Sequence, residues 1–210
     1  MLNRYARALA TRIFTPLARL LLRLGIGPDA VTMAGTLGVV VSALVLFPLG
    51  QLAWGAVAVG AFVLSDTVDG IMARSLGRSG RWGAYLDSTL DRFGDAAVFG
   101  GLVVWFARGG DSPATAGLAL LCLVLGSLVS YAKARAEGLG FTADVGIAER
   151  SDRLLAVLAG ALAVGLGAPV PVMTVVLVLL AVASLVTVVQ RMAVVRRQAL
   201  AGAPEPARGA

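Results

Sequence analysis

The chain has 210 residues, of which 58% are hydrophobic and only 14% are charged, and its net charge is +6. Soluble domains usually have about 45–50% apolar and about 25% charged residues, so this composition excludes an ordinary soluble domain and requires contact with lipid. The chain contains no histidine, so any general base must be a carboxylate, a lysine, a tyrosine or the single cysteine, Cys122. That cysteine lies in an apolar run, and we expect it to be a small buried side chain.

The N-terminal residues 1–24 place arginines among apolar residues at helical spacing, which predicts an amphipathic helix lying at the membrane surface. Six apolar runs follow, and a helix needs about 20 such residues to cross a membrane. These runs lie at 31–49, 52–73, 83–107, 114–134, 152–168 and 170–190. We therefore expect an all-α polytopic protein with six transmembrane helices within 31–194. It forms one domain over 1–200, and a disordered tail follows over 201–210.

Basic residues are concentrated on one side of this predicted topology. Sixteen of the 18 lysines and arginines lie before the first run, between runs two and three, between runs four and five, or after run six. The connections near residues 50 and 168 contain none. Since cytoplasmic loops are enriched in lysine and arginine, both termini are expected in the cytoplasm. The same distribution explains the positive charge without a nucleic-acid partner.

Four aspartates lie in the second and third runs, near their predicted cytoplasmic ends. Asp66 and Asp69 are three residues apart and Asp87 and Asp91 are four apart, so each pair shares a helix face. An aspartate at the centre of a spanning helix costs about 2.5–3.5 kcal/mol, and like charges repel. A bound cation removes both penalties. Because the donors are hard oxygens, Mg²⁺, Mn²⁺ or Ca²⁺ is expected, and phosphoryl-transfer sites often bind two metals about 3.5–4 Å apart.

These aspartates belong to a longer pattern, Asp-x2-Asp-Gly-x2-Ala-Arg-x8-Gly-x3-Asp-x3-Asp, over residues 66–91. The pattern resembles the signature of the CDP-alcohol phosphotransferase family. The resemblance implies a six-helix, often dimeric, membrane enzyme that transfers a phosphatidyl group from CDP-diacylglycerol to a polar alcohol. It implies two metal ions, Mg²⁺ with Mn²⁺ as an alternative, held by all four aspartates, with Asp91 as the catalytic base. Asp95 lies outside the pattern and is expected to support the site or to pair with Arg92.

The donor is expected to bind beside the small residues of this pattern. Glycine and alanine allow a diphosphate to approach the backbone closely, and an arginine can pair with phosphate in fork geometry. With the residues that open the first run, the expected CDP-diacylglycerol site comprises Asp29, Ala30, Val31, Thr32, Gly70, Ala73, Arg74 and Gly83.

Three further cations point to the acceptor. Lys133, Arg153 and Arg191 lie at the cytoplasmic ends of the last three runs, at the depth of the aspartates. Cations there would bind a phosphate group, so a phosphorylated acceptor is favoured over choline or ethanolamine. The stretch from Ser130 to Arg153 and the segment from Pro28 to Thr32 resemble the bacterial members of the family that use inositol phosphate and release CMP. That resemblance implies a homodimer in a bacterial plasma membrane, with the active site facing the cytoplasm.

Other functions remain open. Glycerol 3-phosphate is an alternative acceptor, which would make the product phosphatidylglycerophosphate. A transporter of divalent cations would also place carboxylates in the membrane. However, the aspartates cluster near one face and no pair of spans looks interrupted, which favours an enzyme. A scaffold without catalysis would leave the cost of the four carboxylates unexplained.

Overall fold

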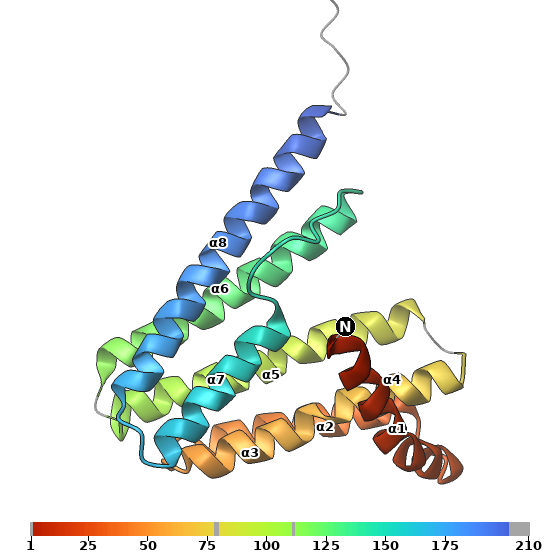
Figure 1. Cartoon of the computed structure of the whole chain (residues 1–210), viewed down its shortest axis with the longest axis horizontal. Helices are drawn as coiled ribbons and strands as arrows, with labels where there is room; N and C mark the ends of the chain where they lie inside the picture. The colour runs from red at the N-terminus through yellow and green to blue at the C-terminus, as the bar shows by residue number, and fades with distance from the viewer. Residues whose placement is uncertain (1, 78–79, 111, 202–210) are drawn as a thin grey trace, which may run out of the picture.

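A computed structural model describes residues 2–77, 80–110 and 112–201, and every regular element in these ranges is an α-helix (Figure 1). The predicted disordered tail lies outside these residues, except for Ala201, which ends the last helix. The helices are α1 (Leu2–Arg23), α2 (Pro28–Leu46), α3 (Leu52–Val63), α4 (Ser65–Ser75), α5 (Arg81–Arg108), α6 (Pro113–Gly138), α7 (Arg150–Gly165) and α8 (Pro171–Ala201).

The second apolar run forms two helices, α3 and α4, which together make one candidate span over Leu52–Ser75, so this predicted span holds by length and composition. The helical pattern is interrupted at Leu64, between α3 and α4. The Ser65 hydroxyl donates to the carbonyl of Phe62 (2.6 Å), which is the kind of local bond that competes with helical hydrogen bonding. Leu64 keeps helical dihedral angles, with φ −64° and ψ −18°, so α4 continues close to the direction of α3.

Six helices form a closed ring around the main core. In order around the ring, α2 contacts α5, α5 contacts α6, α6 contacts α8, α8 contacts α7, α7 contacts α3 and α3 contacts α2. Figure 1 shows α6 and α8 running side by side, and α4 beside α1 at the opposite end of the molecule. The ring brings the start of α7 close to α4 and α5, which are far from it in sequence.

Large apolar side chains fill the ring. Phe47, Phe106, Leu102, Met173 and Leu177 are all fully buried. Cys122 is also buried, as predicted, and its thiol donates to the carbonyl of Leu177 at 3.2 Å. A smaller cluster joins α1 to α4 through Ala18, Val68, Ile71 and Met72.

Within the described ranges, four segments are long and apolar enough to cross a membrane. They are Pro28–Leu46, Leu52–Ser75, Pro113–Gly138 and Pro171–Ala201. The six-span prediction therefore holds by length and composition for four segments. Helix α5 carries three aspartates and three arginines, and α7 has 16 residues, which gives a length of about 24 Å. Many large apolar side chains on the outer surface are exposed, among them Leu155, Leu166 and Leu179, as expected for a surface that faces lipid.

Close packing of α2 against α5 depends on a glycine. A Cβ atom on Gly101 would lie 2.4 Å from the carbonyl oxygen of Ala43, whereas one on Gly100 would meet nothing within 4 Å. Small residues at such contacts let membrane helices approach each other closely.

We predict that Gly101→Ala lowers the stability of the fold by about 1–3 kcal/mol, the usual cost of overpacking. Gly100→Ala is the matched control on the same helix and should be neutral or slightly stabilising, because alanine favours helix. Thermal unfolding of both purified variants in detergent measures the difference. Equal melting temperatures would contradict the proposed contact.

Candidate active site

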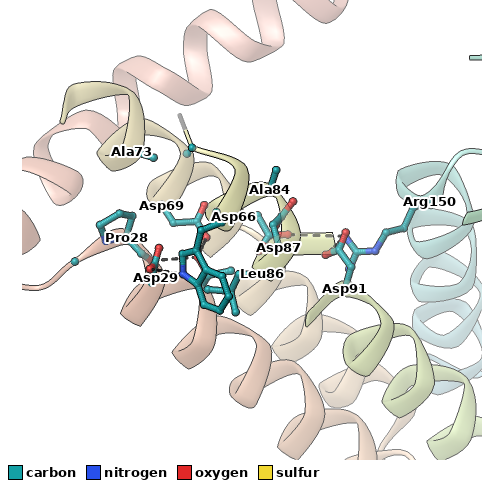
Figure 2. A pocket seen from close by; sticks show the side chains of 16 residues that line it. Pro28, Asp29, Asp66, Asp69, Ala73, Ala84, Leu86, Asp87, Asp91 and Arg150 are labelled. Carbon is teal, nitrogen blue, oxygen red and sulfur yellow. Dashed lines mark hydrogen bonds and ion pairs between the residues drawn. The ribbon is translucent and has the colours of Figure 1, made fainter. Parts of the chain in front are cut away.

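One cavity collects most of the residues of the sequence pattern. It has a volume of about 760 Å³ and lies where the start of α2, the length of α4 and the start of α5 meet (Figure 2). Seven residues of the predicted donor site and metal site face it from α4 and α5, namely Asp66, Asp69, Gly70, Ala73, Gly83, Asp87 and Asp91. The prediction that the two aspartate pairs face each other is therefore confirmed.

The start of α2 completes the wall of the cavity. Helix α2 begins at Pro28, whose fixed φ suits the first helical position. Asp29 and Thr32 follow within one turn, and both line the cavity. The Thr32 hydroxyl donates to the carboxylate of Asp69, which links α2 to α4. Trp82 at the start of α5 donates its indole N–H to Asp29 (3.1 Å), so the two ends of the wall are also joined.

Three residues of the predicted donor site do not line this cavity. Ala30 is exposed, and Val31 packs against the cluster between α1 and α4. The Arg74 guanidinium lies over Gly70, where an added Cβ would be 3.3 Å from Nη1. The glycine therefore leaves room for the arginine side chain. A role for these three residues in donor binding remains a prediction.

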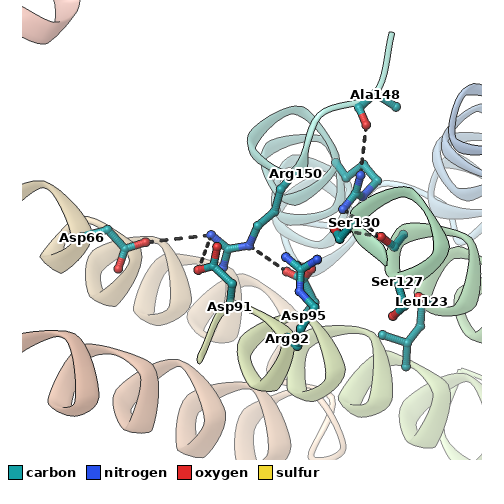
Figure 3. Close-up of polar contacts among 11 residues, drawn as sticks. Asp66, Asp91, Arg92, Asp95, Leu123, Ser127, Ser130, Ala148 and Arg150 are labelled. Atoms are coloured by element: carbon teal, nitrogen blue, oxygen red, sulfur yellow. Dashed lines mark hydrogen bonds and ion pairs between the residues drawn. The ribbon is translucent and has the colours of Figure 1, made fainter. Parts of the chain in front are cut away.

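Arg150 is the charged residue of the cavity lining that the sequence reasoning missed. Its Nη1 lies 2.7 Å from Oδ1 of Asp91 and 4.0 Å from Oδ2 of Asp66, and its Nε donates to Oδ1 of Asp95 at 3.2 Å (Figure 3). Asp95 also pairs with Arg92 at 3.4 Å, as expected. In the sequence Arg150 was one of several basic residues near a connection. Its position three residues before Arg153, at the start of α7, was the sequence feature that could have indicated a place near the site.

The donor atoms suit a divalent metal. The cavity offers five carboxylates, counting Asp29, and the Thr32 hydroxyl, and hard oxygens are the ligands of Mg²⁺ and Mn²⁺. As the side chains are placed, no three acidic, histidine or cysteine residues in the described part of the chain converge closely enough to hold a metal. Arg150 balances the charge of Asp66 and Asp91 in this arrangement. The residues therefore fit a metal by chemistry, after local rearrangement of the carboxylates.

The three predicted acceptor cations converge on the connection between α6 and α7. Lys133 pairs with Asp144 (2.5 Å), Arg191 donates from Nε to the carbonyl of Val145 (3.0 Å), and Arg153 donates from Nη1 to the carbonyl of Ala148 (3.0 Å). None of the three lines the cavity of the aspartates. The tertiary structure thus brings them together, while their binding of an acceptor remains a prediction.

The three cations differ in accessibility. Arg153 and Arg191 are buried, with 3% and 6% exposure, whereas the Lys133 side chain is 40% exposed. Through its hydrogen bond and its charge, the Lys133 ammonium lowers the pKa of Asp144 below the ordinary value for an aspartate. Asp144 therefore stays ionised at neutral pH and keeps its pair with Lys133.

Arg191 has a structural role that its charge alone does not explain. Its guanidinium donates to the carbonyls of Val145 and Val129, which joins the α6–α7 connection to α6. A lysine has all its donors on one nitrogen and does not reproduce the fork that places Nε and Nη1 on the two carbonyls.

We predict that Arg191→Lys destabilises the protein by about 1–3 kcal/mol, the cost of a buried carbonyl left without a donor. Arg197→Lys is the control, since Arg197 is exposed on the same helix and contacts only the carbonyl of Ala193 in its own helix. Thermal unfolding should separate the two variants. If both melt alike, the buried bonds contribute little.

Comparison with known proteins agrees with this geometry. Residues 26–147 match the CDP-alcohol phosphatidyltransferase family. The chain is 48% identical over 204 residues to a phosphatidylinositol phosphate synthase of Streptomyces avermitilis, a match that covers 94% of this chain and 84% of that one. It is 50% identical over 205 residues to the Mycolicibacterium smegmatis protein of the same name, covering 95% and 90% of the two chains.

Solved structures of a relative have the same fold. The Mycobacterium tuberculosis phosphatidylinositol phosphate synthase with CDP-DAG bound is 47% identical and superposes with a TM-score of 0.84, covering 88% of this chain and 94% of that one. The same protein in complex with manganese and citrate is 46% identical, with a TM-score of 0.84 and coverage of 87% and 88%. The sequence pattern, the helical ring and these similarities together show that the chain belongs to the CDP-alcohol phosphatidyltransferase family.

Proposed function

We propose that the chain transfers the phosphatidyl group of CDP-diacylglycerol to inositol phosphate and releases CMP, with phosphatidylinositol phosphate as the product. The observation that carries the proposal is the gathering of the aspartates in one cavity, beside a loop on which three cations converge. The names of the relatives and the bound CDP-DAG of one of them support the choice of donor and acceptor.

The proposal includes six membrane spans, with α5 and α7 as the two beyond the four apolar segments. Both helices lie in the same ring as those segments, which supports a shared depth in the membrane. Helix α1 would lie at the cytoplasmic surface, since it is amphipathic and packs on α4 near the cavity. Both termini and the active site would face the cytoplasm, in the plasma membrane of a bacterium and in a homodimer.

We assign the metal site to Asp66, Asp69, Asp87 and Asp91. Two ions are proposed, with Mg²⁺ as the first choice and Mn²⁺ as an alternative, and the manganese complex of a relative supports a divalent cation. When bound, such ions supply positive charge that neutralises the diphosphate and the CMP leaving group. Thr32 would orient the Asp69 carboxylate for this role through its hydrogen bond.

The reaction needs a base on the side of the acceptor. Asp91 would accept the proton of the acceptor hydroxyl, and the freed oxygen would attack the lipid-side phosphorus as the bond to CMP breaks. Asp91 suits this role because, of the four proposed metal ligands, it makes the shortest contact with Arg150 of α7, at 2.7 Å. The backbone at Gly70 and the Arg74 guanidinium would hold the diphosphate in place.

The acceptor's phosphate would bind to Lys133, Arg153 and Arg191. Arg153 follows Arg150 by one turn of α7, so the acceptor cations lie next to the carboxylate cluster. The charge of Asp95 and those of Arg92, Arg150 and Arg191 all act on Arg153, so several cations lie near the place proposed for the anion. The same cations would bind glycerol 3-phosphate, which therefore stays the alternative acceptor.

We predict that purified protein releases CMP from CDP-diacylglycerol when inositol phosphate and Mg²⁺ are present, and that a chelator stops this release until metal is restored. Faster turnover with glycerol 3-phosphate would identify that compound as the acceptor, and a transporter would release no CMP.

We predict that Lys133→Gln raises the KM for inositol phosphate by about tenfold or more, which corresponds to the loss of one hydrogen bond to a charged group. An unchanged KM would remove Lys133 from the acceptor site.

We predict that Asp91→Asn lowers kcat by about 100-fold or more, since an amide keeps the shape of the side chain but cannot accept the proton. CDP-diacylglycerol should still bind in the presence of metal. Asp152→Asn is the control, because Asp152 accepts the backbone N–H of Glu149 at 3.2 Å in the capping box of α7, and the side-chain oxygen of asparagine can accept the same bond. Near-normal turnover of the Asp91 variant would reject its assignment as the base.

A further inference from the structure

The Arg150 side chain joins carboxylates that belong to two different parts of the site. One side of its guanidinium faces the proposed metal ligands, with Nη1 at 2.7 Å from Asp91 and 4.0 Å from Asp66. The other side, through Nε, is held by Asp95 at 3.2 Å. Asp95 is not a proposed metal ligand and is 8% exposed. Arg150 is therefore anchored outside the metal site and reaches into it (Figure 3).

A metal ion and the Arg150 guanidinium would compete for the same oxygen of Asp91, Oδ1. Divalent cations bind carboxylate oxygens at about 2.0–2.6 Å, which is inside the distance between Arg150 and Oδ1 of Asp91. Two cations on the same oxygen would also repel each other strongly in a partly buried site. We propose that Arg150 is an internal counter-ion that competes with the divalent metal for Asp91 and Asp66. The proposal rests on the metal site assigned above.

Asp95 would keep Arg150 near the site when a metal ion replaces it at Asp91. The second oxygen of Asp95 is held by Arg92, and Gly94 lies beside Arg150, since an added Cβ there would be in ordinary contact with Nη2 at 3.7 Å. When Nη1 leaves Asp91, the bond from Nε to Asp95 can remain. Asp95 is thus a positioning residue that keeps the displaced guanidinium at the edge of the site.

The displaced Arg150 side chain would then strengthen binding of the acceptor's phosphate. Arg150 precedes Arg153 by three residues on α7 and its charge already acts on Arg153. A guanidinium no longer neutralised by Asp91 adds positive charge on this side of the site. Metal binding at the aspartates would therefore strengthen binding of the acceptor's phosphate, a coupling between two neighbouring sites.

The test is a titration of the full-length protein in detergent with Mn²⁺ alone. Binding is monitored by calorimetry or by the spin-resonance signal of free Mn²⁺. Arg150→Gln should bind Mn²⁺ roughly tenfold more tightly than the wild type, within the range usual for coupled sites. Arg92→Gln is the matched control, because Arg92 carries the same charge and contacts Asp95 but no proposed metal ligand. Its Mn²⁺ affinity should stay close to that of the wild type.

A second readout uses stability. Without divalent metal, Arg150→Gln should melt below the wild type, because the carboxylates lose their counter-ion, and Mn²⁺ should raise its melting temperature more than it raises that of the wild type. Should the glutamine variant not fold, Arg150→Lys decides. Lysine lacks the separate Nε and Nη1 that hold Asp95 and Asp91, so its hold on Asp91 is weaker and Mn²⁺ should again bind more tightly.

Three results would overturn the inference in distinguishable ways. Equal or weaker Mn²⁺ binding by the Arg150 variants would mean that Arg150 supports the metal site and does not compete for it. Equal tightening by Arg92→Gln would show a general effect of charge. A wild type that binds no Mn²⁺ would instead reject the metal site of the proposed function, on which the inference depends.

Discussion

The need to balance four carboxylates at one end of an apolar helical ring governs this structure. Asp66 and Asp69 lie on α4, which continues from α3, and Asp87 and Asp91 lie on α5 of the ring. Water cannot screen these carboxylates as it would on an open surface. Two contacts in the site help to balance this negative charge. Thr32 donates to Asp69, and Arg150 reaches across from α7 to Asp91. The position of α7 is thus part of the electrostatics of the site as well as of its packing.

The ring supplies a rigid frame through close contacts at small residues. Besides Gly101, an added Cβ on Gly35 would lie 1.8 Å from the Ser65 hydroxyl, and one on Gly165 would lie 2.2 Å from the backbone nitrogen of Ala53. Such contacts fix α2 against α4 and α7 against α3 without polar groups that lipid would leave unpaired. Because these helices are fixed, the side chains at the end of the ring that holds the cavity are kept in register.

Two sets of charge meet at that end. The aspartates of α4 and α5 form the negative set, and the cations around the α6–α7 connection form the positive set. Thr187 adds to the order of this connection, since its hydroxyl accepts hydrogen bonds from the backbone N–H groups of Ile147 and Ala148. Arg150 lies at the boundary between the two sets. A reaction between a diphosphate held by metal and a phosphorylated alcohol needs such adjacent regions of opposite charge.

The sequence by itself determined the helical class, the apolar runs and the aspartate pattern, because these depend on local spacing and on the cost of charge in lipid. It also predicted that Lys133, Arg153 and Arg191 lie together, from their place at the ends of helices. Only the tertiary structure decided the interruption at Leu64, the close contact at Gly101 and the pairing of Arg150 with Asp91 and Asp95. These features depend on how distant helices cross, and Arg150 in particular looks in the sequence like any basic residue near a membrane surface, because its partners lie about 55 to 84 residues earlier in the chain.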